Sequence, residues 1–167
     1  MKTIYWKQRG LISLWKYREN THNYPGWNLT ADKVGVESLL ELCNELSSCI
    51  SRCDYHTISV TTPTASVLRI PNNKYDKAKW IAPRKWVIRY VSGSEASKQW
   101  MFSQDAQETV TLELGYGYMQ QFIAGLIDIA DAKGDYSIGK TYKEDRLWFW
   151  WWPRSEERRV GKECRSR

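Results

Sequence analysis

The sequence contains few of the residues on which most catalytic and metal sites depend. Two histidines, four cysteines and three methionines occur among its 167 residues. It has no H-E-x-x-H, no G-x-S-x-G, no phosphate-binding loop and no dinucleotide-binding fingerprint, so the enzyme classes that these motifs mark are not indicated. We expect no cofactor.

Long apolar runs are also absent. The longest, Leu147–Trp152, has six residues, whereas a membrane-spanning helix needs about 20. The amino-terminal residues 1–10 lack the apolar segment of a secretory signal peptide. We therefore expect a cytoplasmic protein that does not associate with a membrane and keeps its thiols reduced.

One group of potential metal ligands has an unsuitable spacing. Cys43, Cys49, Cys53 and His56 are separated by five, three and two intervening residues, whereas structural zinc sites use short paired knuckles such as C-x2-C. Cys43 also falls on the apolar face of a predicted helix, where a free cysteine behaves as a small hydrophobic residue. We expect no metal site here.

The last fourteen residues, Arg154–Arg167, resemble a DNA reagent more than a protein. Their sequence, RSEERRVGKECRSR, is the translation of one frame of a common short-read sequencing adapter, with every codon in order. We therefore expect one domain over residues 1–153 and interpret residues 154–167 as adapter read-through. Without them 19 basic and 16 acidic residues remain, so the formal charge is +3 and not +6. A charge of that size is weak support for a nucleic-acid partner.

Apolar periodicity predicts two helices and eight strands. The helices are expected over Ala31–Cys49, with Thr30 as the N-cap, and over Tyr116–Lys133, with Gly134 following the last turn. The strands are expected over Lys2–Lys7, Leu11–Tyr17, Thr57–Thr61, Ser66–Ile70, Lys85–Val91, Lys98–Ser103, Thr109–Leu114 and Leu147–Trp152.

These elements follow one another in the order ββαββ-βββαβ. We expect the first two strands to form a hairpin around Gly10, residues 20–28 to form a loop, and the three strands within residues 85–114 to be antiparallel. Strands outnumber helices and the connections are short. This pattern predicts an α+β domain in which a largely antiparallel sheet carries two helices packed on one face.

The aromatic composition is the most unusual feature of the sequence. Ten tryptophans and ten tyrosines stand against three phenylalanines, and the strand Leu147–Trp152 is apolar on both faces. Either a loop or a second copy of the chain covers the second face, or that face presents rings to a partner. The candidate partner surface consists of Trp148, Trp150 and Trp152 together with the adjacent turn residues Asp135 and Tyr136.

Basic and aromatic residues alternate in a second stretch, residues 74–90. Cations that follow phosphates, mixed with rings that stack on bases, are typical of sites for single-stranded nucleic acid. Alternation along the strand predicts that Trp86 and Tyr90 are buried while the cations face solvent, which separates the rings from the charges. The candidate nucleic-acid residues are Lys74, Lys77, Lys79, Arg84, Lys85 and Arg89.

The absence of a catalytic pattern and the abundance of aromatic residues favour a binding role. Our first hypothesis is a non-enzymatic cytoplasmic interaction protein, of the kind represented by bacterial inhibitors and immunity proteins, that binds a protein partner and can form a homodimer. The alternative is a nucleic-acid-binding module that uses the basic stretch. A small enzyme with an unrecognised site, built around Asp135 and His22 or His56, is the second alternative.

Overall fold

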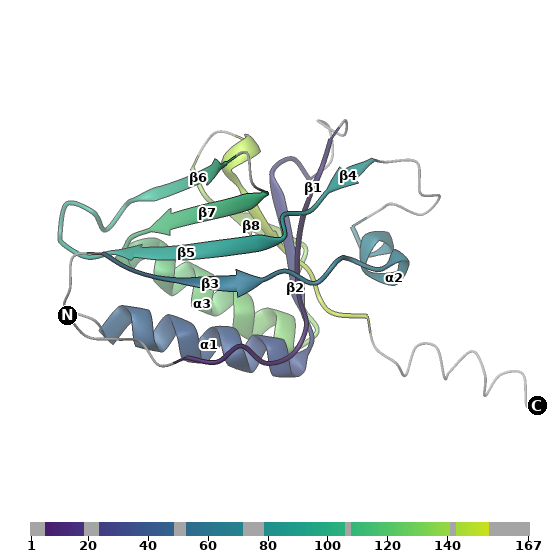
Figure 1. Cartoon of the computed structure of the whole chain (residues 1–167), viewed down its shortest axis with the longest axis horizontal. Coiled ribbons are helices and arrows are strands. Elements are labelled where there is room, and N and C mark those ends of the chain that lie inside the picture. Colours follow the sequence, from purple (N-terminus) through teal and green to yellow (C-terminus); the bar gives the residue numbers. More distant parts are fainter. Residues whose placement is uncertain are drawn as a thin grey trace, which may run out of the picture.

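The computed structural model describes residues 6–18, 24–48, 53–71, 79–105, 108–140 and 143–153. These residues form two β-sheets and two long helices that pack against each other (Figure 1). The α+β class predicted from the sequence is confirmed, and the strands divide into two mostly antiparallel sheets. Within the described ranges, no helix combines the length and the apolar character that crossing a bilayer requires.

The first sheet has five strands in the order β4-β1-β2-β9-β8. β2 and β9 run parallel, which places Leu29 beside Phe149, and the other neighbours run antiparallel. The strands are β1 (Ile12–Tyr17), β2 (Trp27–Ala31), β4 (Trp80–Ile81), β8 (Tyr136–Ile138) and β9 (Leu147–Phe149).

The predicted amino-terminal hairpin is wrong. Residues 2–5 of its first strand lie outside the described residues, and Trp6 and Lys7 belong to no strand. β1 instead pairs with β2 on one side and β4 on the other. Gly10 adopts the left-handed conformation (φ 77°), but the turn directs the preceding residues toward α1 (Lys33–Ser48), where the Trp6 indole donates a hydrogen bond to the Ser38 carbonyl.

β2 was predicted in part as loop, because Pro25 and Gly26 carry a turn signal. Trp27 and Asn28 nevertheless begin the strand, since β1 and β9 supply its hydrogen-bonding partners from elsewhere in the chain. β9 ends at Phe149, earlier than the predicted Trp152.

The second sheet has four strands in the order β3-β5-β7-β6. Its strands are β3 (Cys53–Ser59), β5 (Lys85–Val91), β6 (Trp100–Gln104) and β7 (Thr109–Leu114). The predicted bounds of β5 and β7 are confirmed, but the expectation of three consecutive antiparallel strands is wrong, because β7 lies between β5 and β6 and runs parallel to β5. β7 buries Val110, Leu112 and Leu114, whereas β6 buries Trp100 alone, so the more apolar strand takes the interior position.

A predicted strand over Ser66–Ile70 is a short helix, α2 (Ala65–Arg69). The Thr64 hydroxyl oxygen accepts a hydrogen bond from the Val67 N–H at 3.3 Å, the usual geometry of a helix N-cap. This local bond and the burial of Val67 and Leu68 outweigh the strand preference of the β-branched residues.

The two long helices were predicted nearly correctly, but their ends differ. α1 is capped by Asp32, whose Oδ1 accepts hydrogen bonds from the N–H groups of Gly35 (2.7 Å) and Leu11 (3.0 Å), and not by Thr30, which is buried in β2. α3 (Tyr116–Ala130) ends before the predicted Lys133. The left-handed residue that follows the helix is Ala132 (φ 60°), whereas the sequence predicted Gly134 in this role.

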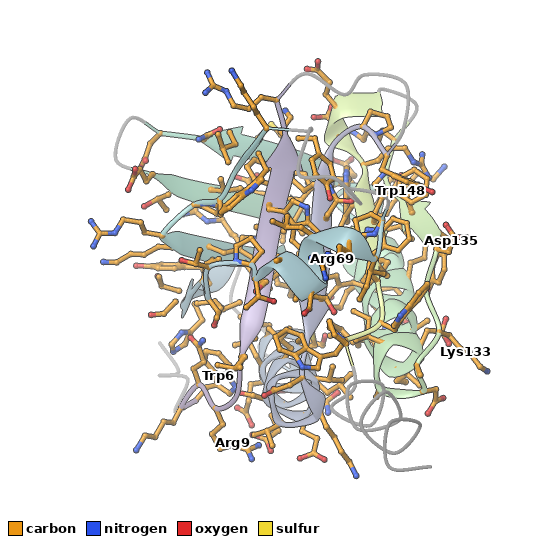
Figure 2. The ribbon with its side chains drawn as sticks, turned by 90° about the vertical axis from the view of Figure 1, so that its right-hand side faces the viewer. Trp6, Arg9, Arg69, Lys133, Asp135 and Trp148 are labelled. Carbon is orange, nitrogen blue, oxygen red and sulfur yellow. The ribbon has the colours of Figure 1, made fainter. Side chains whose placement is uncertain are left out.

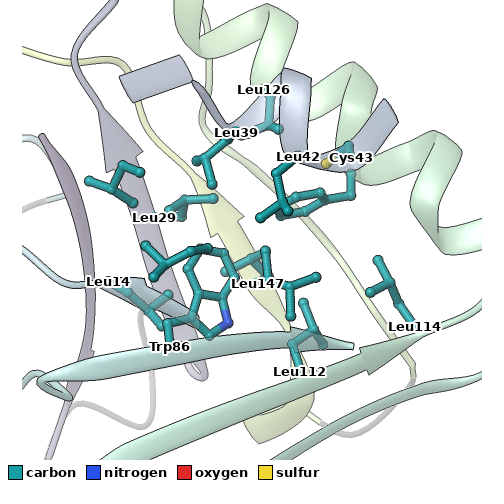
Figure 3. Close-up of a cluster of buried hydrophobic side chains, with 14 of the residues drawn as sticks. Leu14, Leu29, Leu39, Leu42, Cys43, Trp86, Leu112, Leu114, Leu126 and Leu147 are labelled. Carbon is teal, nitrogen blue, oxygen red and sulfur yellow. The ribbon is translucent and has the colours of Figure 1, made fainter. Parts of the chain in front are cut away.

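The main core lies where the two helices meet both sheets. α1 and α3 cover one face of the four-stranded sheet. The five-stranded sheet lies along one side of the two layers that these helices and this sheet form (Figure 1). Figure 3 shows side chains from all four parts converging: Leu39, Leu42 and Cys43 from α1, Leu126 from α3, Leu14, Leu29 and Leu147 from the first sheet, and Trp86, Leu112 and Leu114 from the second.

Candidate functional site

A separate aromatic cluster lies on the other face of the five-stranded sheet. Because side chains alternate along a strand, Leu147 and Phe149 enter the main core while Trp150 belongs to this second cluster and Trp148 packs against it. Its buried members are Trp15, Tyr17, Val67, Leu68 and Trp150. We call the half-buried rings next to Trp150 the aromatic face: Tyr24, Trp148, Trp151 and Trp152.

Hydrogen bonds fix the base of the aromatic face. The Trp150 indole N–H donates to Asn28 Oδ1 at 2.8 Å, and the Trp148 indole N–H donates to the Pro25 carbonyl at 2.9 Å. The Asn28 amide nitrogen donates in turn to the Trp15 carbonyl at 3.4 Å. Asn28 is fully buried. Its amide supplies hydrogen-bonding partners to the Trp150 indole N–H and the Trp15 carbonyl, which would otherwise lack them beneath the rings.

The rings pack in favourable aromatic geometry. Trp148 and Trp150 are stacked, with centroids 6.0 Å apart and an interplanar angle of 14°. Tyr24 places its ring perpendicular to both, at 5.0 Å from Trp148 and 4.8 Å from Trp150. The Tyr24 backbone has φ 53°, a left-handed conformation that a non-glycine residue rarely adopts. Packing against the two tryptophans therefore holds Tyr24 in a backbone conformation that it would not otherwise prefer.

α2 covers the middle of this sheet face. The Tyr17 hydroxyl donates to the Leu68 carbonyl at 3.3 Å, and Val67 and Leu68 pack against Trp15 and Trp150. Burial raises the pKa of Tyr17 from its ordinary value of 10 to about 12. Figure 2 looks onto this side of the molecule, where α2 crosses in front of β1 and Trp148 and Asp135 lie to one side of it.

The structure places the predicted residues of the aromatic strand in different environments. Trp150 is 2% exposed and belongs to a covered core, whereas Trp148 and Trp152 keep part of their surface in solvent. Trp151 was not among the predicted residues, because strand alternation ceases to apply after Phe149. Tyr24 was also missed, since nothing in the local sequence indicates that it packs on β9.

The turn residues Asp135 and Tyr136 have different environments. Asp135 is exposed with φ 71°, and its N–H donates to the Phe149 carbonyl at 2.9 Å. The Tyr136 hydroxyl donates to Asp128 Oδ2 at 2.8 Å, and its ring lies 5.5 Å from that of Phe149. Burial, the bond to Asp128 and the charge of that carboxylate all raise the pKa of Tyr136. Asp135 thus faces solvent, while the Tyr136 hydroxyl links β8 to α3.

The described candidate nucleic-acid residues are divided between the two sheets. Lys74 and Lys77 lie outside the described residues. Lys79 adjoins the first sheet, where its carbonyl accepts a hydrogen bond from Arg18 N–H.

The other three, Arg84, Lys85 and Arg89, belong to the second sheet. Arg84 lies 3.9 Å from a Glu108 oxygen, and Arg89 lies 4.0 Å from a Glu113 oxygen and over the Tyr55 ring at 5.3 Å. Acidic residues beside the arginines weaken their attraction for phosphate. The predicted burial of Trp86 and Tyr90 behind these cations is confirmed.

No described residues form the catalytic arrangement that the second alternative requires. His22 lies outside the described residues, and His56 packs against Trp6 with ring centroids 4.8 Å apart. Cys43 is fully buried, and burial raises the pKa of its thiol, so it is not an activated nucleophile. Among the described residues, no group of three or more His, Cys, Asp or Glu side chains is placed to hold a metal ion.

Comparison of the chain with known protein families, with curated proteins and with solved structures found no match.

Proposed function

We propose that the protein is a non-enzymatic interaction protein that binds a protein partner through the aromatic face. The observation that carries the proposal is the set of half-buried rings of Tyr24, Trp148, Trp151 and Trp152 on a buried, hydrogen-bonded base. Tryptophan and tyrosine supply large contact areas and dominate the binding energy of many protein interfaces. Rings that are fixed before binding lose little conformational entropy on association.

The surroundings of the aromatic face have the polar character of an interface rim. Asp135 is exposed near Trp148, and Lys133 and Arg69 of α2 are also exposed (Figure 2). A partner with an apolar centre and a mixed-charge margin fits this surface. Such a protein acts by occupying its partner, as bacterial inhibitors and immunity proteins do, and we propose that it does so in the cytoplasm.

The test compares partner capture by three forms of the full chain. In the first form Trp148 and Trp152 are both changed to alanine, and the second is the wild type. The third is Tyr55→Ala, which removes an exposed ring (57%) from the other sheet and serves as the matched control. Circular dichroism and urea unfolding establish that all three fold.

Proteins captured from bacterial extracts are quantified for each form. The proposal requires a protein that the wild type and Tyr55→Ala retain and the Trp148/Trp152 variant loses, and that then binds the purified chain with a negative heat-capacity change. If every captured protein binds the Trp148/Trp152 variant as well as the wild type, the aromatic face is not the binding site.

The nucleic-acid alternative is separated by a salt titration. Fluorescence anisotropy with labelled single-stranded and duplex oligonucleotides is measured at several salt concentrations. Binding that weakens steeply as salt rises indicates phosphate contacts and replaces the present proposal if Lys85→Ala and Arg89→Ala reduce it. Absence of binding at low salt removes the alternative.

A further inference from the structure

The solvent side of α3 carries no charge over about three turns. Its exposed residues recur at helical spacing, and we call them the α3 stripe: Tyr116, Gln120, Ala124 and Ile127. Tyr116 is 58% exposed and Ile127 is 46% exposed. A surface helix normally presents charged residues opposite its apolar face. The α3 stripe is therefore an unusually apolar surface for a helix that faces solvent.

The charges of the helical layer lie elsewhere. α1, which lies beside α3 (Figure 1), exposes Lys33, Glu37 and Glu41. Within α3 the one charged residue is Asp128. Its carboxylate accepts a hydrogen bond from the Tyr136 hydroxyl of β8, so it lies off the stripe.

Neither end of α3 has the charge that the helix dipole favours. The first turn contains no acidic residue, and the N-cap Gly115 forms no side-chain hydrogen bond. The last turn contains no basic residue, and the exposed Asp131 follows it. The Asp131 carboxylate forms no hydrogen bond or ion pair with any described residue, the exposed Lys133 included. A carboxylate is unfavourable at the negative end of a helix and stabilising at the positive end.

We propose that the α3 stripe packs antiparallel against the α3 stripe of a second copy of the chain. With the two-fold axis midway along the stripe, Tyr116 lies beside Ile127 of the other copy, and Gln120 lies beside Ala124. The two large apolar side chains of the stripe thus cover each other twice in one closed interface. Ala124, near the axis, is small enough for the two helices to approach closely.

Charge complementarity favours a second copy over an unrelated partner. Antiparallel packing brings the Asp131 end of each helix to the first turn of the other, where the dipole is positive and no acidic residue is present. The stripe has no charge, so no like charges meet across the two-fold axis. Each copy therefore supplies at one end of α3 the charge that the other copy lacks there.

The experiment is sedimentation equilibrium of the full chain over a concentration series, with two variants that carry the same substitution. Gln120→Glu places a carboxylate on the stripe, close to the same carboxylate of the other copy. Gln121→Glu changes the adjacent exposed position, which lies off the stripe, and is the matched control. We expect the wild type and Gln121→Glu to dimerise and Gln120→Glu to raise the dimer dissociation constant by about tenfold or more.

Asp131→Asn tests the electrostatic argument. The dimer loses two carboxylates that lie beside helix amino-terminal ends, so its dissociation constant should rise by about threefold or more. The monomer loses an unfavourable charge at its own helix end, so at low concentration its urea stability should not fall. Equal dissociation constants for the wild type and Asp131→Asn would overturn the antiparallel arrangement.

Tyrosine modification of the wild type provides a measurement that needs no variant. Tyr116 and Tyr55 are almost equally exposed, at 58% and 57%, but Tyr55 belongs to β3 and lies outside the proposed interface. Acetylation of Tyr116 by N-acetylimidazole should slow as protein concentration rises, while acetylation of Tyr55 should not change.

A wild type that stays monomeric at the highest concentration overturns the proposal, as does a Gln120→Glu variant that dimerises as tightly as Gln121→Glu. The Trp148/Trp152 alanine variant leaves α3 unchanged and should dimerise normally. Failure of the aromatic-face proposal is therefore distinguishable from failure of this one.

Discussion

Gly125 of α3 lies directly against the ring of Phe149 in β9. A Cβ added at Gly125 would lie 2.5 Å from two ring carbons, closer than any real contact allows. Phe149 is fully buried and also packs near Phe122 and Tyr136, so its ring has no free space to enter. The glycine is what allows the helix to approach the strand.

Gly125→Ala is therefore expected to destabilise the protein, although alanine is the better helix former. The helix-propensity gain is about 1 kcal/mol, and overpacking of a filled core costs typically ~1–3 kcal/mol. We expect a net loss of free energy of unfolding, measured by urea denaturation. Combining Gly125→Ala with Phe149→Leu should recover part of the loss. If the single variant is more stable than the wild type, Gly125 does not pack closely enough on Phe149 to exclude a Cβ atom.

Asn28 is expected to stabilise the aromatic face through its buried amide. Asn28→Leu keeps the side-chain volume but leaves the Trp150 indole N–H without its acceptor, which should lower the free energy of unfolding by ~1–3 kcal/mol. In a Trp150→Phe background that N–H is absent, so the same substitution should cost less. Equal losses in both backgrounds, measured by chemical denaturation, would show that the hydrogen bond contributes nothing.

The stability of the protein should fall as pH rises from 10 to 12. Tyr17 has its pKa raised from 10 to about 12 in the folded protein, so the folded state keeps the hydroxyl proton over a range in which the unfolded chain loses it. The stabilisation is complete below pH 10 and is lost as pH rises through 12. Tyr17 is 7% exposed, and a difference of this size is worth up to ~2–3 kcal/mol.

Tyr17→Phe tests this pH dependence directly. The variant should show a shallower decline of urea-unfolding stability between pH 10 and pH 12 than the wild type. Tyr55→Phe removes a tyrosine hydroxyl from an exposed position and is the matched control. Identical slopes for the wild type and Tyr17→Phe would show that the Tyr17 hydroxyl is not kept protonated by folding.

Gln8 is expected to protect the edge of β3. Its side-chain Nε2 donates to the Ser59 carbonyl and its Oε1 accepts from the Ser59 N–H, each at 2.8 Å. Gln8→Ala exposes the outward N–H and C=O of Ser59 and should cost about 1 kcal/mol of stability. Hydrogen exchange of the Ser59 amide should accelerate by a larger factor than that of the Ile58 amide, which faces β5. Gln8→Glu keeps an acceptor for the Ser59 N–H, so it should preserve more of the protection than alanine does.

The sequence predicted those features that depend on local periodicity. The bounds of β5 and β7, the start of α3 and the burial of Trp86 and Tyr90 all follow from alternation or helical spacing, and the structure confirms them. The position of β7 between β5 and β6 could not be predicted this way. Neighbour order depends on which strands bury most surface together, and no window of a few residues contains that information.

α2 could have been recognised from the sequence. Thr64 lies three residues before Val67, at the spacing of an N-cap bond, and Pro63 ends the preceding strand pattern. β2 and the position of Tyr24 could not be recognised from the local sequence. β2 pairs with β9 and Tyr24 packs against Trp148, and both of these partners lie near the far end of the described chain. The aromatic strand itself indicated that one face required an unusual environment, and the structure shows that α2 covers part of it.

The parallel pairing of β2 with β9 also has a consequence for synthesis on the ribosome. β9 is translated after every other described strand, yet it fills the space between β2 and β8. Until β9 has emerged, one side of β2 lacks its neighbouring strand. The Asn28 side-chain oxygen likewise lacks the hydrogen bond that the Trp150 indole N–H donates. Long-range pairing of this kind folds slowly and leaves apolar surface exposed meanwhile. The chain should therefore depend on ribosome-bound chaperones most strongly in the interval before β9 has emerged.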